Sequence, residues 1–97
     1  MPSTIVITGG AGFVGSHLAV WSRRRAPQAR VVAFDNLRRR GSELTLARLQ
    51  DAGVDFVHGD IRNPEDLARL PRSDLVIDCA AEPSVYASET GSPRELL

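Results

Sequence analysis

The chain has 97 residues, enough for one small domain, and its hydrophobic share of 42% and charged share of 25% are typical of a globular protein. Its 12 basic residues balance 12 acidic ones, so no net charge would draw it to nucleic acid or to an anionic membrane surface. No apolar run approaches the ~20 residues that span a membrane.

Cysteine and histidine are scarce. A single cysteine, Cys79, excludes an internal disulfide and a multi-cysteine metal site, and its apolar context predicts a buried, unreactive thiol. His17 and His58 have no neighbouring ligand cluster, so we predict no metal site. The first residues lack a basic segment followed by an apolar one, so we expect no signal peptide and a cytoplasmic location.

The chain opens with a strand followed by a helix. The unbroken apolar run over 5–7 predicts a strand buried on both faces of a parallel sheet. A helix is expected over 13–25, with Val14, Leu18 and Trp21 on its inner stripe. It ends before a proline, which cannot continue the helical hydrogen bonds.

The same alternation continues along the rest of the chain. The further segments expected are a strand over 30–35, a helix that starts near 42 and is closed by residues 52–53, a strand over 54–60, a short helix from 64 and a strand over 74–81. Asn63 and Pro64 are typical of an N-cap and of the first position of a helix. Residues 94–97 resemble the first turn of another helix.

This alternation predicts an α/β fold of the Rossmann type. Strands separated by helices form a doubly wound parallel sheet with right-handed crossovers, here with strand order 3-2-1-4. We expect residues 1–97 to form the first four strands of such a sheet, which is then incomplete, and no second domain. In such a sheet, ligands bind at the carboxyl ends of the strands.

The most informative motif follows the first strand. The stretch TGGAGFVG contains four glycines, which are Gly9, Gly10, Gly12 and Gly15. Their spacing fits the dinucleotide fingerprint, in which glycine allows a tight turn, close approach of a pyrophosphate and close helix packing. The amides near Gly12, Phe13 and Val14 would lie at a helix N-terminus, which favours an anion. The motif therefore predicts a dinucleotide site.

Asp35 ends the second strand, twenty residues after Gly15. A carboxylate at this spacing accepts hydrogen bonds from the adenosine ribose and repels a 2′-phosphate, which favours NAD over NADP. The arginines over 38–40 are either a solvated face or a phosphate clamp, and the clamp would favour NADP. NAD is the better-supported cofactor.

The last two strands end in further candidate cofactor-binding residues. Asp60 could accept from the adenine amino group with Ile61 beside the ring, or it could simply end a strand in an exposed turn. Ala80 and Ala81 are small enough to let the cofactor pass close by, although small residues also simply pack.

Taken together, the stretches TGGAGFVGSHL, FDNL, GDIRN and DCAAEPSV resemble the extended short-chain dehydrogenase/reductase family, in its NAD-dependent epimerase/dehydratase branch. Within that branch the chain looks most like nucleotide-sugar 2-epimerases of the CDP-paratose/CDP-tyvelose type. The resemblance adds Asn36, in FDNL, to the cofactor-binding residues. It also marks Asp78 as a departure, because many members have histidine there.

The resemblance implies transient oxidation of a nucleotide sugar. NAD takes a hydride from a sugar carbon while a tyrosine acts as base beside a lysine four residues later, and the hydride then returns to the opposite face. This chain has no lysine, and its single tyrosine, Tyr86, is followed by Thr90 at that spacing. No catalytic residue is therefore predicted. The resemblance implies that residues 1–97 are the N-terminal part of the NAD(P)-binding Rossmann domain of an epimerase, and we expect this portion to be inactive alone.

Two other functions stay open: a dehydratase or reductase of the same family, and a non-catalytic dinucleotide-binding module. The fourth strand would have an unpaired edge, so we also expect a homo-oligomer or association through that edge.

Overall fold

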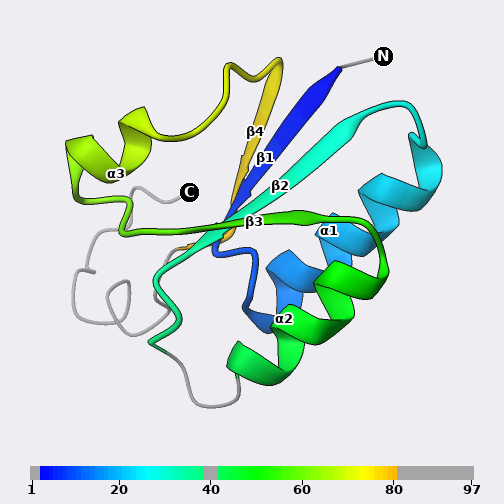
Figure 1. Cartoon of the computed structure of the whole chain (residues 1–97), viewed down its shortest axis with the longest axis horizontal. Helices are drawn as coiled ribbons and strands as arrows, with labels where there is room; N and C mark the ends of the chain where they lie inside the picture. The colour runs from blue at the N-terminus through cyan, green and yellow to red at the C-terminus, as the bar shows by residue number, and fades with distance from the viewer. Residues whose placement is uncertain (1–2, 39–41, 81–97) are drawn as a thin grey trace, which may run out of the picture.

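The computed structural model describes residues 3–38 and 42–80 of the chain (Figure 1). Its elements, in chain order, are β1 (Thr4–Thr8), α1 (Phe13–Arg25), β2 (Arg30–Asp35), α2 (Ser42–Asp51), β3 (Asp55–His58), α3 (Pro64–Ala68) and β4 (Leu75–Asp78). Every expected strand and helix in these ranges is present, although β3 and β4 are shorter than predicted. The expectations for Arg39, Arg40 and residues 81–97 lie outside the described residues.

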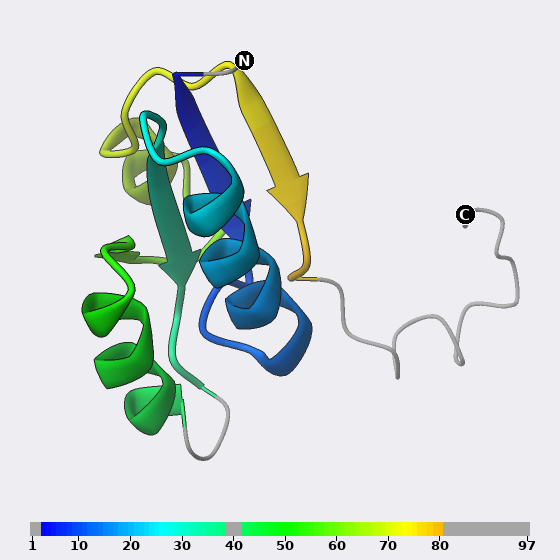
Figure 2. The same ribbon diagram turned by 90° about the vertical axis from the view of Figure 1, so that its right-hand side faces the viewer.

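The four strands form one parallel sheet in the order β3-β2-β1-β4. The predicted topology is thus confirmed, and β1 lies at the point where the winding reverses. Figure 2 shows the shared direction of the strands, which brings their carboxyl ends to one edge of the sheet.

Both faces of the two central strands are buried, as the apolar run over 5–7 predicts. On one face, Ile5 and Ile7 pack with residues of α1 and α2, including the fully buried Leu49. On the other face, Val6 packs with Val32 and Phe34, and Leu70 from the segment after α3 contacts this cluster. The β1–β2 pair is therefore the buried centre of the sheet.

The prediction that Val14, Leu18 and Trp21 form the inner stripe of α1 is wrong. Val14 and Trp21 are 60% and 56% exposed, and Leu18 is only partly buried. The buried residues of this helix are mostly small, namely Gly15, Ser16, Ala19, Val20 and Ser22. Small side chains let the helix axis approach the sheet closely, and this close packing turns the larger apolar side chains outward.

The edges of the sheet differ from its centre. In β4, Val76 is 57% exposed and Leu75 is also exposed, and within the described residues this strand pairs with β1 alone. The start of β4 is tied to β1 by Asp74, whose carboxylate accepts from the amides of Ser3 and Thr4 at 2.9 and 3.0 Å. No helix in the described part of the chain is long and apolar enough to cross a membrane.

Candidate functional site

The carboxyl ends of the strands bring the predicted site residues to one edge of the sheet. The turn between β1 and α1 holds the glycines, and the segments after β2, β3 and β4 hold Asp35, Asp60 and Ala80. The register of the paired strands places Thr8 of β1 beside Phe34 of β2 and Asp78 of β4. Residues that are far apart in sequence are therefore neighbours here.

Three glycines of the turn, Gly9, Gly10 and Gly15, are required by the fold itself, because a Cβ at each would lie within 3 Å of other atoms. Gly9 has φ +69°, and a Cβ at this position would lie 2.5 Å from the carbonyl oxygen of Cys79. A Cβ at Gly15 would collide with the carbonyl oxygen of Gly9. The turn is further fixed by the amide of Gly9, which donates to the carbonyl of Phe34 at 2.8 Å. Glycine therefore lets α1 start directly against the ends of β1 and β4.

Gly12 is different, because it has φ −79° and ψ 176°, which any residue can adopt. It is the N-cap of α1 and provides no side-chain cap, and the first turn of the helix has no acidic residue. Within the described residues, the amides of Phe13 and Val14 donate to no acceptor. Unpaired amides at the N-terminus of a 13-residue helix form a favourable environment for an anion.

Asp35 joins two loops. One carboxylate oxygen accepts from the amide of Ala11 in the glycine turn at 2.9 Å, and the other accepts from the amide of Leu37 at 2.8 Å. The side chain thus lies against the glycine turn. It also has a structural role that the spacing alone did not predict, because it fixes the turn relative to β2.

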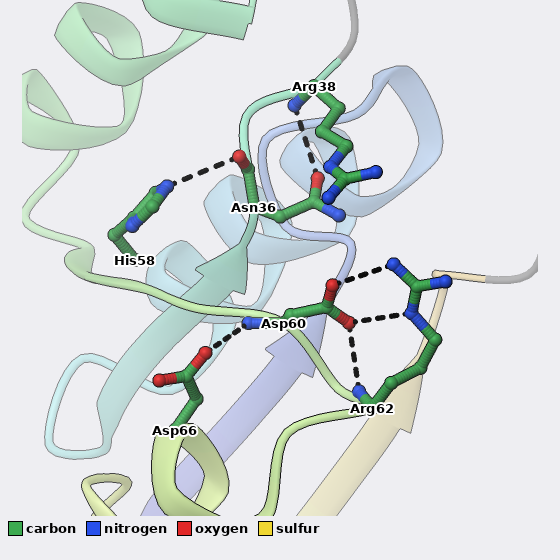
Figure 3. A network of polar contacts seen from close by, with 6 residues as sticks. All are labelled: Asn36, Arg38, His58, Asp60, Arg62 and Asp66. Atoms are coloured by element: carbon green, nitrogen blue, oxygen red, sulfur yellow. Dashed lines mark hydrogen bonds and ion pairs between the residues drawn. The ribbon is translucent and has the colours of Figure 1, made fainter.

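Asn36 continues the same loop. Its side-chain oxygen accepts from the amide of Arg38 at 3.1 Å, and its carbonyl accepts from Nε2 of His58 at 3.2 Å (Figure 3). His58, the last residue of β3, therefore contacts the backbone of the loop after β2. No group of three potential metal ligands occurs in the described ranges 3–38 and 42–80.

Asp60 is paired with a residue that the sequence reasoning missed. Arg62 donates to its carboxylate through Nε at 3.1 Å, through Nη2 at 2.9 Å and through its backbone amide at 2.9 Å (Figure 3). These bonds hold the pKa of Asp60 well below its usual range. The signal was present in the Asp-x-Arg spacing, since an aspartate in a turn accepts from the amide two residues on.

The end of β3 is tied to α3. The amide of Asp60 donates to the carboxylate of Asp66 at 2.9 Å, and this bond lowers the pKa of Asp66. Asn63 caps α3 by accepting from the amide of Glu65 at 2.9 Å, as predicted. Ile61 is exposed beside this turn.

Asp78, the residue noted above as a departure from the family resemblance, ends β4. Its Oδ1 accepts from the hydroxyl of Thr8 at 2.7 Å and from the amide of Ala80 at 3.0 Å. Ala80 is thus held near the glycine turn. Burial and then the neighbouring Asp78 raise the pKa of the partly buried Cys79 thiol, which keeps it protonated and unreactive.

The predicted residues therefore fall into two groups. Gly9, Gly15, Asp35 and Ala80 are joined by contacts at the β1–α1 turn, whereas Asp60 and Ile61 belong to the neighbouring β3–α3 turn. Ala81 lies outside the described residues.

Comparisons with known proteins agree with this arrangement. The family model for the NAD dependent epimerase/dehydratase family matches residues 5–96. The chain is 45% identical over 67 residues to CDP-paratose 2-epimerase of Salmonella typhi, covering 68% of this chain and 19% of that protein. It is 38% identical over 93 residues to dTDP-glucose 4,6-dehydratase of Xanthomonas campestris, covering 92% of this chain and 26% of that protein.

Solved structures of a dehydratase and an epimerase also match this chain. The dTDP-glucose 4,6-dehydratase of Bacillus anthracis, in complex with NAD, matches with TM-score 0.70 and 29% identity over 88% of this chain and 29% of that one. The UDP-glucose-4-epimerase of Stenotrophomonas maltophila, with bound NAD, matches with TM-score 0.69 and 30% identity over 91% of this chain and 27% of that one.

The chain spans 19% and 26% of the length of the two curated relatives described above. The matched residues include the four strands of the sheet and every loop of the candidate site. By sequence and by fold, this chain belongs to the NAD-dependent epimerase/dehydratase family.

Proposed function

We propose that this chain is the NAD-binding, N-terminal portion of a nucleotide-sugar epimerase. The pyrophosphate of NAD lies at the amides of Phe13, Val14 and Gly15, and Asp35 and Asn36 face the adenosine ribose. The turn after β3, with Asp60 and Ile61, borders the adenine. Ala80, followed by Ala81, borders the cofactor at the end of β4.

The conformation of Gly12 carries this proposal. Gly9 and Gly15 are explained by the fold, because a side chain at either would meet backbone atoms. Gly12 has ordinary extended dihedral angles and begins a helix with no capping side chain. A bound pyrophosphate supplies the missing reason for a glycine, since it needs both the unpaired amides and a backbone without a side chain.

Substitution of Gly12 tests the proposal. We expect Gly12→Ala to keep the melting temperature near that of the wild type and to weaken NAD binding at least about tenfold in calorimetric titration, roughly 1.4 kcal/mol. Gly53→Ala is the matched control: it is far from the site in sequence and has φ +82°. It should lower stability by ~1 kcal/mol and leave the NAD affinity of the folded chain unchanged. Unchanged NAD affinity in Gly12→Ala would remove the helix N-terminus from the site.

The proposed reaction rests on the relatives. CDP-paratose 2-epimerase of Salmonella typhi favours an epimerase, and the dehydratases of similar identity keep a dehydratase as the second candidate. With no lysine in its sequence, this chain lacks the pair of a tyrosine base and a lysine four residues later that the family resemblance implies. We therefore expect it to bind NAD without reducing it when a nucleotide sugar is added, as followed by absorbance of NADH.

The proposal includes association through β4 and a cytoplasmic location. The exposed side chains of Leu75 and Val76 support association through β4. The single cysteine, Cys79, is a free thiol, which supports a cytoplasmic location. Light scattering of the purified chain tests the first. A monodisperse monomer that binds NAD would contradict it, whereas dimers dispersed by Leu75→Lys with Val76→Lys would support it.

A further inference from the structure

The end of β4 is fastened to β1 through one carboxylate oxygen. Oδ1 of Asp78 accepts from the hydroxyl of Thr8 at 2.7 Å and from the amide of Ala80 at 3.0 Å. The backbone adds one bond between the same strands, from the amide of Cys79 to the carbonyl of Thr8 at 2.9 Å. Hydrogen bonds to an ionised carboxylate are roughly twice as strong as bonds between neutral groups. The Asp78 side chain is therefore a major support of the segment that follows β4.

This segment lies directly against the glycine turn. A Cβ on Gly9 would lie 2.5 Å from the carbonyl oxygen of Cys79 and 2.8 Å from the amide nitrogen of Ala80. The carbonyl of Gly9 in turn accepts from the amide of Gly12, the N-cap of α1, at 3.0 Å. Because closely packed backbone atoms cannot overlap, the position of the segment after β4 limits the position of the turn and of the start of α1.

The opposite end of the same strand pair is held in a similar way. Asp74, just before β4, accepts from the amides of Ser3 and Thr4 at 2.9 and 3.0 Å and from the hydroxyl of Ser3 at 2.7 Å. Both Asp74 and Asp78 therefore join β4 to β1. Of the two, only Asp78 does so at the carboxyl end of the strands, where the glycine turn lies.

We propose that Asp78 is a positioning residue for the dinucleotide, which holds the segment after β4 against the glycine turn in the arrangement that binds the pyrophosphate. This inference rests on the proposed function, because it assumes that NAD binds at the N-terminus of α1. Both bonds end on Oδ1, and the amide oxygen of an asparagine can accept two hydrogen bonds in the same place. The role therefore depends on the acceptor and its geometry more than on the negative charge.

Substitutions at the two ends of the strand pair separate positioning from stability. In calorimetric titration, we expect Asp78→Ala to weaken NAD binding about tenfold and Asp78→Asn to weaken it less than about threefold. Asp74→Ala is the matched control, because it removes bonds between the same two strands at the far end. It should lower the free energy of unfolding at least as much as Asp78→Ala does and leave the NAD affinity of the folded chain unchanged.

The single cysteine provides a readout that does not depend on NAD. Cys79 is partly buried within the segment that Asp78 holds. Burial and the neighbouring Asp78 raise the pKa of its thiol, and Thr8→Val removes the hydroxyl donor while keeping that carboxylate. We expect an aromatic disulfide reagent to label the thiol at least about threefold faster in Thr8→Val than in the wild type, because the segment opens more often. The labelling rate of Asp74→Ala should stay close to that of the wild type.

The outcomes distinguish the inference from the proposed function. If the wild type binds no NAD, the proposed function fails and the positioning role fails with it. If the wild type binds NAD and Asp78→Ala binds it equally well, the inference alone is overturned. The same follows if Asp74→Ala or Asp78→Asn weakens NAD binding as much as Asp78→Ala, or if Thr8→Val is labelled at the wild-type rate. Should Asp78→Ala fail to fold, Thr8→Val decides, since it should also weaken NAD binding about threefold.

Discussion

The turn after β1 and the turn after β3 lie at the same edge of the sheet, but they are held in different ways. Backbone contacts chiefly hold the first, because the carbonyls of Gly9 and Cys79 occupy the space where side chains would begin, and the Asp35 carboxylate adds one bond from the amide of Ala11. The second is held by side chains, chiefly the pair of Asp60 and Arg62. The first turn is therefore inseparable from the fold, whereas the second can change without unfolding the chain.

Gly15→Ala should have the largest effect on stability, and it tests whether backbone contacts hold the turn after β1. The new Cβ would collide with the carbonyl oxygen of Gly9, which belongs to the backbone and cannot move aside cheaply. We expect a loss of at least ~3 kcal/mol in the free energy of unfolding, the upper part of the range for overpacked sites. Urea unfolding measures it. A melting temperature close to that of the wild type would show that the turn is not held by its backbone.

Asp35→Ala should have an intermediate effect. It removes the carboxylate that accepts from the amides of Ala11 and Leu37, and each of these is a charge-assisted hydrogen bond. We expect a loss of about 1–3 kcal/mol in stability, together with weaker NAD binding of similar size. The exposed Asp51, near the end of α2, provides the matched control, and Asp51→Ala should change neither quantity. Unchanged stability in Asp35→Ala would mean that the two loops are joined by other contacts.

Removing the Arg62 side chain should have the smallest effect on stability. Pairing with Arg62 lowers the pKa of Asp60, so the pair stabilises the folded state above the ordinary aspartate pKa. This contribution decreases as the pH falls below about 4, where the carboxyl group of the unfolded chain becomes protonated, and it is lost as the pH falls through the lowered pKa of folded Asp60. The stability difference between wild type and Arg62→Ala should thus be small at neutral pH and vanish in acid. Urea unfolding across this pH range checks it, and a difference that grows in acid would contradict the pairing.

The sequence predicted the topology well because local patterns are strong in this fold. Apolar runs, an N-cap asparagine and a glycine-rich turn are short-range signals, and the order 3-2-1-4 follows from the alternation of strands and helices. The inner face of α1 could not be predicted by apolar periodicity. Its packing depends on how closely Gly15 and Ala19 let the helix approach the sheet, which is a tertiary property.

The candidate site was predicted as a set of positions but not as a set of contacts. Spacing placed Asp35 at the end of β2, yet its bond to the amide of Ala11 depends on how the glycine turn folds back. Spacing also placed Asp60 after β3, and the Asp-x-Arg pattern indicates the bond from the amide of Arg62 but not the two bonds from its guanidinium. Such pairings depend on side-chain conformations, which local sequence patterns do not determine.

Hydrogen exchange with and without NAD tests the central claim most directly, and it remains applicable if the chain associates. The amides of Phe13, Val14 and Gly15 precede the first internally bonded amides of α1 and should exchange rapidly in the free chain. With saturating NAD, we predict that the peptide covering residues 9–16 becomes protected more than any peptide from α2. Protection elsewhere, with no change in this peptide, would contradict the claim that the glycine turn and the start of α1 bind the dinucleotide.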